Sequence, residues 1–174
     1  MAVVDTYGSR FMTGLDESTT FPPAKAGPGL MGGNVKCVVE TVEVANGDSA
    51  TSTYRLGRIP SNAIILPMSK LHYDDLQTTG SPTMDVGLFN IGNDDGITDD
   101  DNCLASAIDV AGGAGSTSLN GGDIANAGLP AWDYVASQTE DPHQLLEVIA
   151  TLKTVDIDLG GTMTLELYYV EEGN

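Results

Sequence analysis

Basic residues are scarce in this chain of 174 residues. It holds 7 Lys and Arg against 25 Asp and Glu, which gives a formal charge of −18 at pH 7. Proteins that bind a nucleic-acid backbone or an anionic membrane surface do so largely by neutralising phosphates with Lys and Arg. The charge balance therefore excludes nucleic acid and membrane surfaces as expected partners.

Cysteine and long apolar runs are also rare. Cys37 and Cys103 are the two cysteines, and neither lies in a CxxC motif. We expect buried thiols in a protein made in a reducing cytoplasm, and a disulfide between the two stays open. The densest apolar run, residues 63–68, is far too short to span a bilayer. Residues 1–5 lack the basic and apolar regions of a secretory signal, so we expect none.

Motifs for catalysis are missing as well. The chain has no G-x-S-x-G elbow, no HExxH and no Walker loop. Residues 27–32 read G-x-G-x-x-G, but the proline-rich segment before them and the β-type segment after them do not fit a dinucleotide fold. His72 and His143 are expected to be isolated surface histidines. We therefore expect no enzyme and no cofactor.

What is present is an uneven distribution of charge. Residues 1–75 hold six basic and eight acidic residues, a net charge of −2, whereas residues 76–174 hold one basic and seventeen acidic residues, a net charge of −16. One interpretation of this division is an acidic surface that keeps copies apart in solution. A second interpretation gives the molecule a nearly neutral side that faces a larger particle and an acidic side that faces solvent.

An acidic loop is expected after residue 92. Carboxylates are hard oxygen ligands for Ca²⁺, although the spacing does not fit an EF-hand. An irregular Ca²⁺ site and a solvated acidic loop both remain open. The candidate metal ligands are Asp94, Asp95, Asp99, Asp100 and Asp101.

The first residues favour an extended arm. Residues 21–33 contain three prolines and four glycines, which exclude a helix or a central strand. We expect an arm over residues 1–34 that lies against its own domain, a neighbouring copy or a larger assembly. A β domain over residues 35–174 follows. The candidate interface residues in the arm are Phe21, Pro22, Pro23 and Lys25.

Alternating apolar residues predict strands through most of the second domain. Residues 162–170 alternate strictly, with Met163, Leu165, Leu167 and Tyr169 on one face. Other strands are expected at residues 35–45, 51–56, 63–76 with an interruption at Pro67, 83–91 and 143–155. About seven short strands with Gly, Pro and Asn turns indicate an all-β, antiparallel β-sandwich.

Several details of this arrangement follow from local signals. Asn46-Gly47 predicts a hairpin between its flanking strands, and the turn at residues 158–161 predicts a second hairpin between residues 143–155 and 162–170. Residues 103–108 favour a short helical turn behind the aspartates, because the helix dipole favours negative charge there. Residues 112–128 are expected to be a loop, and residues 129–137 a strand or a loop anchored by aromatic residues.

Arg55 and Arg58 are the most informative charged pair. They flank Gly57, where we expect a turn, in an otherwise acidic molecule. Their guanidinium groups suit carboxylates on a neighbouring copy. An ordinary ion pair within the chain is an equal alternative.

The serial order of segments resembles the virion proteins of tailed bacteriophages, in particular head decoration (cement) proteins. The resemblance rests on five segments. They are residues 54–65 (Tyr-Arg-Leu-Gly-Arg-Ile-Pro-Ser-Asn-Ala-Ile-Ile), 84–89 (Met-Asp-Val-Gly-Leu-Phe), 101–110 (Asp-Asn-Cys-Leu-Ala-Ser-Ala-Ile-Asp-Val), 149–153 (Ile-Ala-Thr-Leu-Lys) and 161–170 (Gly-Thr-Met-Thr-Leu-Glu-Leu-Tyr-Tyr-Val). It implies a jelly-roll-like sandwich and a non-enzymatic role on the outer capsid surface, where copies, often as trimers, brace the joints between major capsid protein subunits. The arm and the stretch 112–142 with Trp132 depart from the pattern and are candidate contacts with the shell or within a trimer.

The sequence therefore favours a decoration protein made in the host bacterial cytoplasm. Its partners would be the major capsid protein and itself. A tail, neck or head-fibre component shares the sandwich and the acidity. A carbohydrate-binding or Ca²⁺-dependent adhesion module would use the aspartates and Trp132. An inhibitor that mimics DNA would use the charge of −18.

Overall fold

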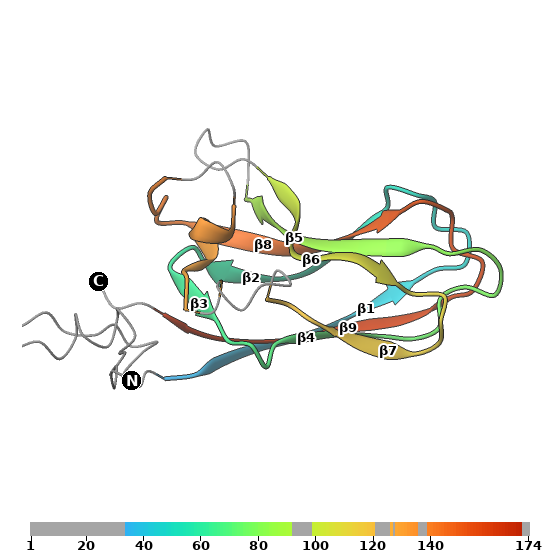
Figure 1. Cartoon of the computed structure of the whole chain (residues 1–174), viewed down its shortest axis with the longest axis horizontal. Helices are drawn as coiled ribbons and strands as arrows, with labels where there is room; N and C mark the ends of the chain where they lie inside the picture. The colour runs from blue at the N-terminus through green and yellow to red at the C-terminus, as the bar shows by residue number, and fades with distance from the viewer. Residues whose placement is uncertain (1–33, 92–98, 121–125, 127, 136–138, 172–174) are drawn as a thin grey trace, which may run out of the picture.

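The computed structural model describes residues 34–91, 99–120, 126, 128–135 and 139–171. Of the predicted arm, only Asn34 falls in this set. The described chain forms two antiparallel sheets that lie face to face (Figure 1). The predicted all-β sandwich is therefore confirmed.

Each sheet is built from strands that are distant in sequence. Sheet A has the order β1-β9-β4-β7, and β3 pairs with the end of β9 beside β4. Sheet B has the order β2-β8-β5-β6. The strands of sheet A are β1 (Lys36–Val44), β3 (Ala63–Ile65), β4 (Lys70–Tyr73), β7 (Gly115–Ser118) and β9 (Gly161–Glu171). Those of sheet B are β2 (Thr53–Pro60), β5 (Thr83–Asn90), β6 (Asp100–Asp109) and β8 (Leu145–Lys153).

The pairing has the nested order of a jelly roll. If the short strand β3 is set aside, the first strand pairs with the last, the second with the last but one, and so on inward: β1 with β9, β2 with β8, β4 with β7, and β5 with β6. Such a chain is one long hairpin folded over on itself, with alternate pairs in the two sheets. The jelly-roll-like topology implied by the resemblance is therefore present.

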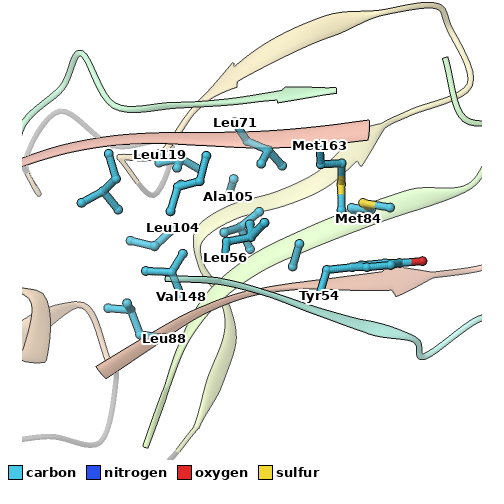
Figure 2. Packing of buried hydrophobic residues seen from close by; sticks show 14 of the residues in the cluster. Tyr54, Leu56, Leu71, Met84, Leu88, Leu104, Ala105, Leu119, Val148 and Met163 are labelled. Carbon is cyan, nitrogen blue, oxygen red and sulfur yellow. The ribbon is translucent and has the colours of Figure 1, made fainter. Parts of the chain in front are cut away.

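The core lies between the sheets, where one face of every main strand is apolar. Met163, Leu165 and Leu167 of β9 are fully buried, as the alternation of residues 162–170 predicts. In Figure 2, Leu71 and Met163 of sheet A point toward side chains of the opposite sheet, and Met163 lies next to Met84. Full burial of one such side chain contributes roughly 1.5–3 kcal/mol. The two sheets are thus held together mainly by apolar side chains.

Both predicted hairpins are wrong, although turns form where expected. The chain crosses from sheet A to sheet B between β1 and β2, and back to sheet A between β8 and β9. The two crossings lie side by side, because Gly47 N donates to Ile157 O at 2.9 Å and Ile157 N donates to Asp48 O at 2.8 Å. A turn signal reverses the chain locally but does not decide which sheet the next strand enters.

Other expectations need correction. Residues 103–108 lie within strand β6 rather than a helical turn, because Leu104, Ala105 and Ile108 pack in the core and the strand pairs with β5. Residues 115–118 of the predicted loop form β7, which pairs with β4. The segment after residue 128 contains a 3₁₀ helix, η2 (Ala131–Tyr134). Pro67 separates two strands, β3 and β4, rather than interrupting one.

Candidate interaction surfaces

The centre of sheet B carries a buried carboxylate on its outer face. Glu147 of β8 has a side chain only 5% exposed, and both predicted arginines cover it. Arg55 Nη1 bonds to Glu147 Oε2, and Arg58 donates to Oε1 from Nη2 at 2.7 Å and from Nε at 3.0 Å. The arginine side chains themselves are 70% and 56% exposed. The structure therefore shows the ion pair within the chain, and two guanidinium groups still reach the surface.

A bulge in β2 brings the two arginines to the same face. Residues three apart in a regular strand point to opposite faces of the sheet. The register of β2 on β8 shifts between Arg55 and Gly57, so one extra residue is inserted and both arginines point outward. Gly57 is therefore part of a bulge and not of the predicted turn. A Cβ there would lie 2.9 Å from Val38 Cγ1, which explains the glycine.

Glu147 is the functional candidate that sequence reasoning missed. It is the one acidic residue in the strand LLEVIATLK, and its neighbours from residue 145 to residue 150 are all apolar. A charge among the apolar residues of such a strand needs a partner, because an unpaired buried charge is costly. That signal was available in the sequence, although the identity of the partner was not.

The other half of the outer face of sheet B is closed by β6. Val86 and Leu88 of β5 are two residues apart, whereas their partners on β6, Ala105 and Asp100, are five residues apart. β6 therefore has three extra residues here, and the backbone of Asp100 and Asp101 crosses directly over Gly87. Lys153 bonds to Asp101 and lies 3.6 Å from Asp85, and the bond to Asp101 raises the pKa of Lys153. This part of the face is filled by the chain's own backbone and ion pairs.

The described aspartates of the acidic loop contact different groups. Asp99 Oδ1 accepts from Asn90 N at 2.9 Å, Asp100 Oδ1 accepts from Asn102 N at 3.3 Å, and Asp101 pairs with Lys153. Asp94 and Asp95 lie outside the described residues. Within the described part of the chain, no three His, Cys, Asp or Glu side chains come together as metal ligands. The Ca²⁺ site stays a prediction.

The outer face of sheet A carries small and polar side chains. Thr41 and Thr164 share a hydrogen bond of 2.9 Å across β1 and β9. Glu166 accepts a hydrogen bond from Tyr168 and lies 3.2 Å from His72 Nε2. The bond from Tyr168 lowers the pKa of Glu166, and the same bond raises the pKa of Tyr168 to about 12. This face is rich in hydroxyl groups and carries separate charges at Glu43, Lys70 and Glu166.

The two histidines do not build a nucleophilic site. His143 Nδ1 lies 3.3 Å from Asp141 Oδ2, and Ser61 Oγ donates to Asp141 Oδ1 at 2.5 Å in a cavity of about 270 Å³. The carboxylate lies between the serine and the histidine, so the histidine is not placed to accept the serine proton. Asp141 also accepts from His143 N at 2.8 Å, which identifies the cluster as a loop-capping arrangement.

The remaining predicted interface residues are Trp132 and those of the arm. Trp132 lies in η2, half-buried, and its backbone N donates to Ser61 O at 3.0 Å. The arm residues Phe21, Pro22, Pro23 and Lys25 lie outside the described residues.

The cysteines are free, and they differ in exposure. Cys103 is half-buried, and burial raises its pKa to about 12. Cys37 is exposed, so the expectation of two buried thiols is wrong for this residue. Its position on the outward-facing register of β1 explains the difference.

The comparisons with known proteins concern the fold. No protein-family model and no curated protein matches the chain. Two solved structures share the fold. A chain of the capsid of Ralstonia phage GP4 is 23% identical, with a TM-score of 0.59, covering 82% of this chain and 87% of that chain. A chain of the cyanophage Pam1 capsid asymmetric unit is 19% identical, with a TM-score of 0.52, covering 80% and 86%. Over the described residues, no helix has the length and apolar character needed to cross a membrane.

Proposed function

We propose that this chain is a structural protein of a bacteriophage virion that binds the outer capsid surface and stabilises the shell. The observation that carries the proposal is the jelly-roll fold shared with capsid chains of two phages over about four-fifths of this chain, 82% and 80%. The partners would be the major capsid protein and further copies of the chain, often as a trimer. Binding only to the assembled shell stabilises that shell by mass action.

The arrangement of charge supports an orientation on the shell. One side of the sandwich is formed by the edge strands β1 and β2, which contact each other and carry three basic residues, Lys36, Arg55 and Arg58, beside two acidic ones, Glu40 and Glu43. The opposite side is formed by β6 and β7, which carry three aspartates and neither lysine nor arginine. We place the β2 surface that carries Arg55 and Arg58 toward the shell and the β6/β7 side toward solvent, in line with the charge difference between the two halves of the sequence.

Particles assembled without this protein test the proposal directly. We expect them to release their genome at a lower temperature than complete particles, and purified protein added back to restore the difference. Genome release is measured by the fluorescence of a DNA-binding dye during heating. Equal heat resistance with and without the protein would overturn the stabilising role.

Two cysteine variants test the orientation. Thr53 of β2 and Ser106 of β6 are both exposed. With Cys37→Ser as background, Thr53→Cys should be protected from a maleimide on the particle, whereas Ser106→Cys should be labelled. Both should be labelled in the free protein. The reverse pattern on the particle would overturn the orientation and leave the stabilising role in place.

A further inference from the structure

With the three-residue strand β3 set aside, the sandwich has four sheet edges among its described strands, and three of them are protected against pairing. Edge strands present unpaired N–H and C=O groups, and natural proteins block them with bulges, charges, proline or short length. β2 has a bulge, two arginines and a terminal Pro60. β6 has two register shifts and three aspartates, and β7 is only four residues long. None of these edges is a suitable template for another strand.

The edge of β1 has no bulge, no proline and no shortened strand, although it carries three charged residues, Lys36, Glu40 and Glu43, of which Lys36 pairs with Glu171 of β9. Its nine residues pair with β9 in unbroken register from Lys36 opposite Tyr169 to Val44 opposite Gly161. Val35 and Val39 are 57% and 62% exposed, and exposed Cys37 lies between them. Such a straight, partly apolar edge is a predicted site of strand addition.

Hydrogen bonds of β9 show which β1 groups are free to pair. Tyr168 O accepts from Leu66 N and Thr162 O accepts from Asp74 N, so the even-numbered residues of β9 bond away from β1. The odd-numbered residues of β9 therefore bond to β1, where their partners are even-numbered, as Leu167 opposite Val38. The backbone groups of Cys37, Val39, Thr41 and Glu43 consequently point to the open side.

We propose that β1 pairs antiparallel with β1 of a second copy about a two-fold axis, with Lys36 of each copy opposite Glu40 of the other. The other sheet edges are blocked, so β1 itself is the complementary edge that this domain offers. Among registers that match the open backbone groups, this one places opposite charges face to face twice. It also sets Cys37 against Val39. A shift of four residues in one copy would place Glu40 opposite Glu40, which is destabilising.

The contact joins one strand of each copy and is therefore small. Interfaces below roughly 1,200 Å² are typical of weak association, so we expect a weak dimer in solution. Many copies on a symmetric shell would strengthen it through multivalency. The proposal that this strand pairing joins neighbouring trimers on the shell rests on the function proposed above. The pairing itself is testable with the purified chain.

Disulfide capture tests both the pairing and its register. In the proposed register residue 37 of one copy faces residue 39 of the other as a hydrogen-bonded pair, whose Cα separation of about 5.5 Å suits a disulfide. With diamide as the oxidant, Val39→Cys should give at least about tenfold more covalent dimer than the wild type. In the wild type the Cys37 residues of the two copies would lie diagonally across the strand pair, about 7–8 Å apart, which is too far for a disulfide. Val39→Cys combined with Cys37→Ser should lose this gain. Equal dimer formation by the wild type would overturn the register, and no dimer from any variant would overturn the pairing.

Charge reversal provides an independent measurement. Lys36→Glu and Glu40→Lys should each weaken dimerisation in sedimentation experiments, and the double variant should restore it. Val39→Lys should abolish the dimer, whereas the matched control Met68→Lys, at a similarly exposed residue away from β1, should keep it. Unchanged dimerisation of Val39→Lys would overturn the inference. Shell stabilisation without dimers would leave the proposed function intact.

Discussion

The outer faces of the two sheets differ in how they treat charge and space. Sheet B buries Glu147 beneath Arg55 and Arg58 and covers Gly87 with the backbone of β6. Sheet A leaves its outer face to hydroxyl groups, and its β1 edge exposes Val35 and Val39. The face of sheet B is largely completed by its own chain, whereas sheet A retains an edge on which another strand can pair. The difference separates a face stabilised by its own ion pairs and backbone from an edge whose backbone groups are left open.

A side chain at Gly87 should have the largest effect. The Cβ of Gly87→Ala would lie 1.9 Å from Asp100 O and 2.5 Å from Asp101 Cα. Since these are backbone atoms, β6 must move, and we expect a loss of about 3 kcal/mol or more. Urea denaturation measures it. Gly112→Ala is the control, because its Cβ would meet only Asp109 Oδ2 at 3.7 Å, and it should change stability by less than about 0.5 kcal/mol.

Separating Glu147 from its arginines should have the next largest effect. Arg55→Ala with Arg58→Ala leaves a buried carboxylate without donors, and we expect a loss of about 2 kcal/mol, less than for a fully buried pair because the arginines are exposed. Glu147→Gln leaves the arginines in contact with water and should cost about 1 kcal/mol or less. Thermal denaturation of both variants compares them. A larger loss for Glu147→Gln would contradict this account of sheet B.

Acid should loosen the crossings between the two sheets. Asp158 accepts hydrogen bonds from the backbone and hydroxyl groups of Thr78 and Thr79, and these bonds lower its pKa. A depressed folded-state pKa contributes stability above the ordinary aspartate pKa of about 3.9, and this stability is lost as pH falls through the folded-state value. Asp158→Asn should therefore flatten the fall in melting temperature between about pH 4 and pH 2. Asp133→Asn is the exposed control and should leave the slope unchanged.

The smallest effect is expected on the outer face of sheet A. The hydrogen bond to Glu166 raises the pKa of Tyr168 to about 12. Glu166→Gln removes the charge of the acceptor, so the pKa of Tyr168 should fall toward the ordinary tyrosine value of about 10 with little change in stability. Carbon NMR of tyrosine rings measures it. Tyr134, whose pKa is about 12 through burial, is an internal control that should not move.

Local pattern predicted much of the fold but little of its pairing. Met163, Leu165 and Leu167 share one face of β9 as predicted, and that face is buried, because alternation within a strand follows from backbone geometry alone. The hairpins failed because the sheet that a strand enters depends on contacts far along the chain. The partner of Arg55 and Arg58 could not be predicted for a similar reason, since Glu147 lies 92 and 89 residues away from them in sequence.

The sequence by itself determined the alternation of the strands, the sandwich class and the acidity of the second half. The tertiary structure decided that the strands nest as a jelly roll, that a bulge brings two arginines onto one carboxylate, and that β1 forms the open edge. Alternation needs only the geometry of neighbouring residues. Pairing, register and edge position depend on which distant segments bury their apolar faces together, so they are defined only when the whole domain has folded.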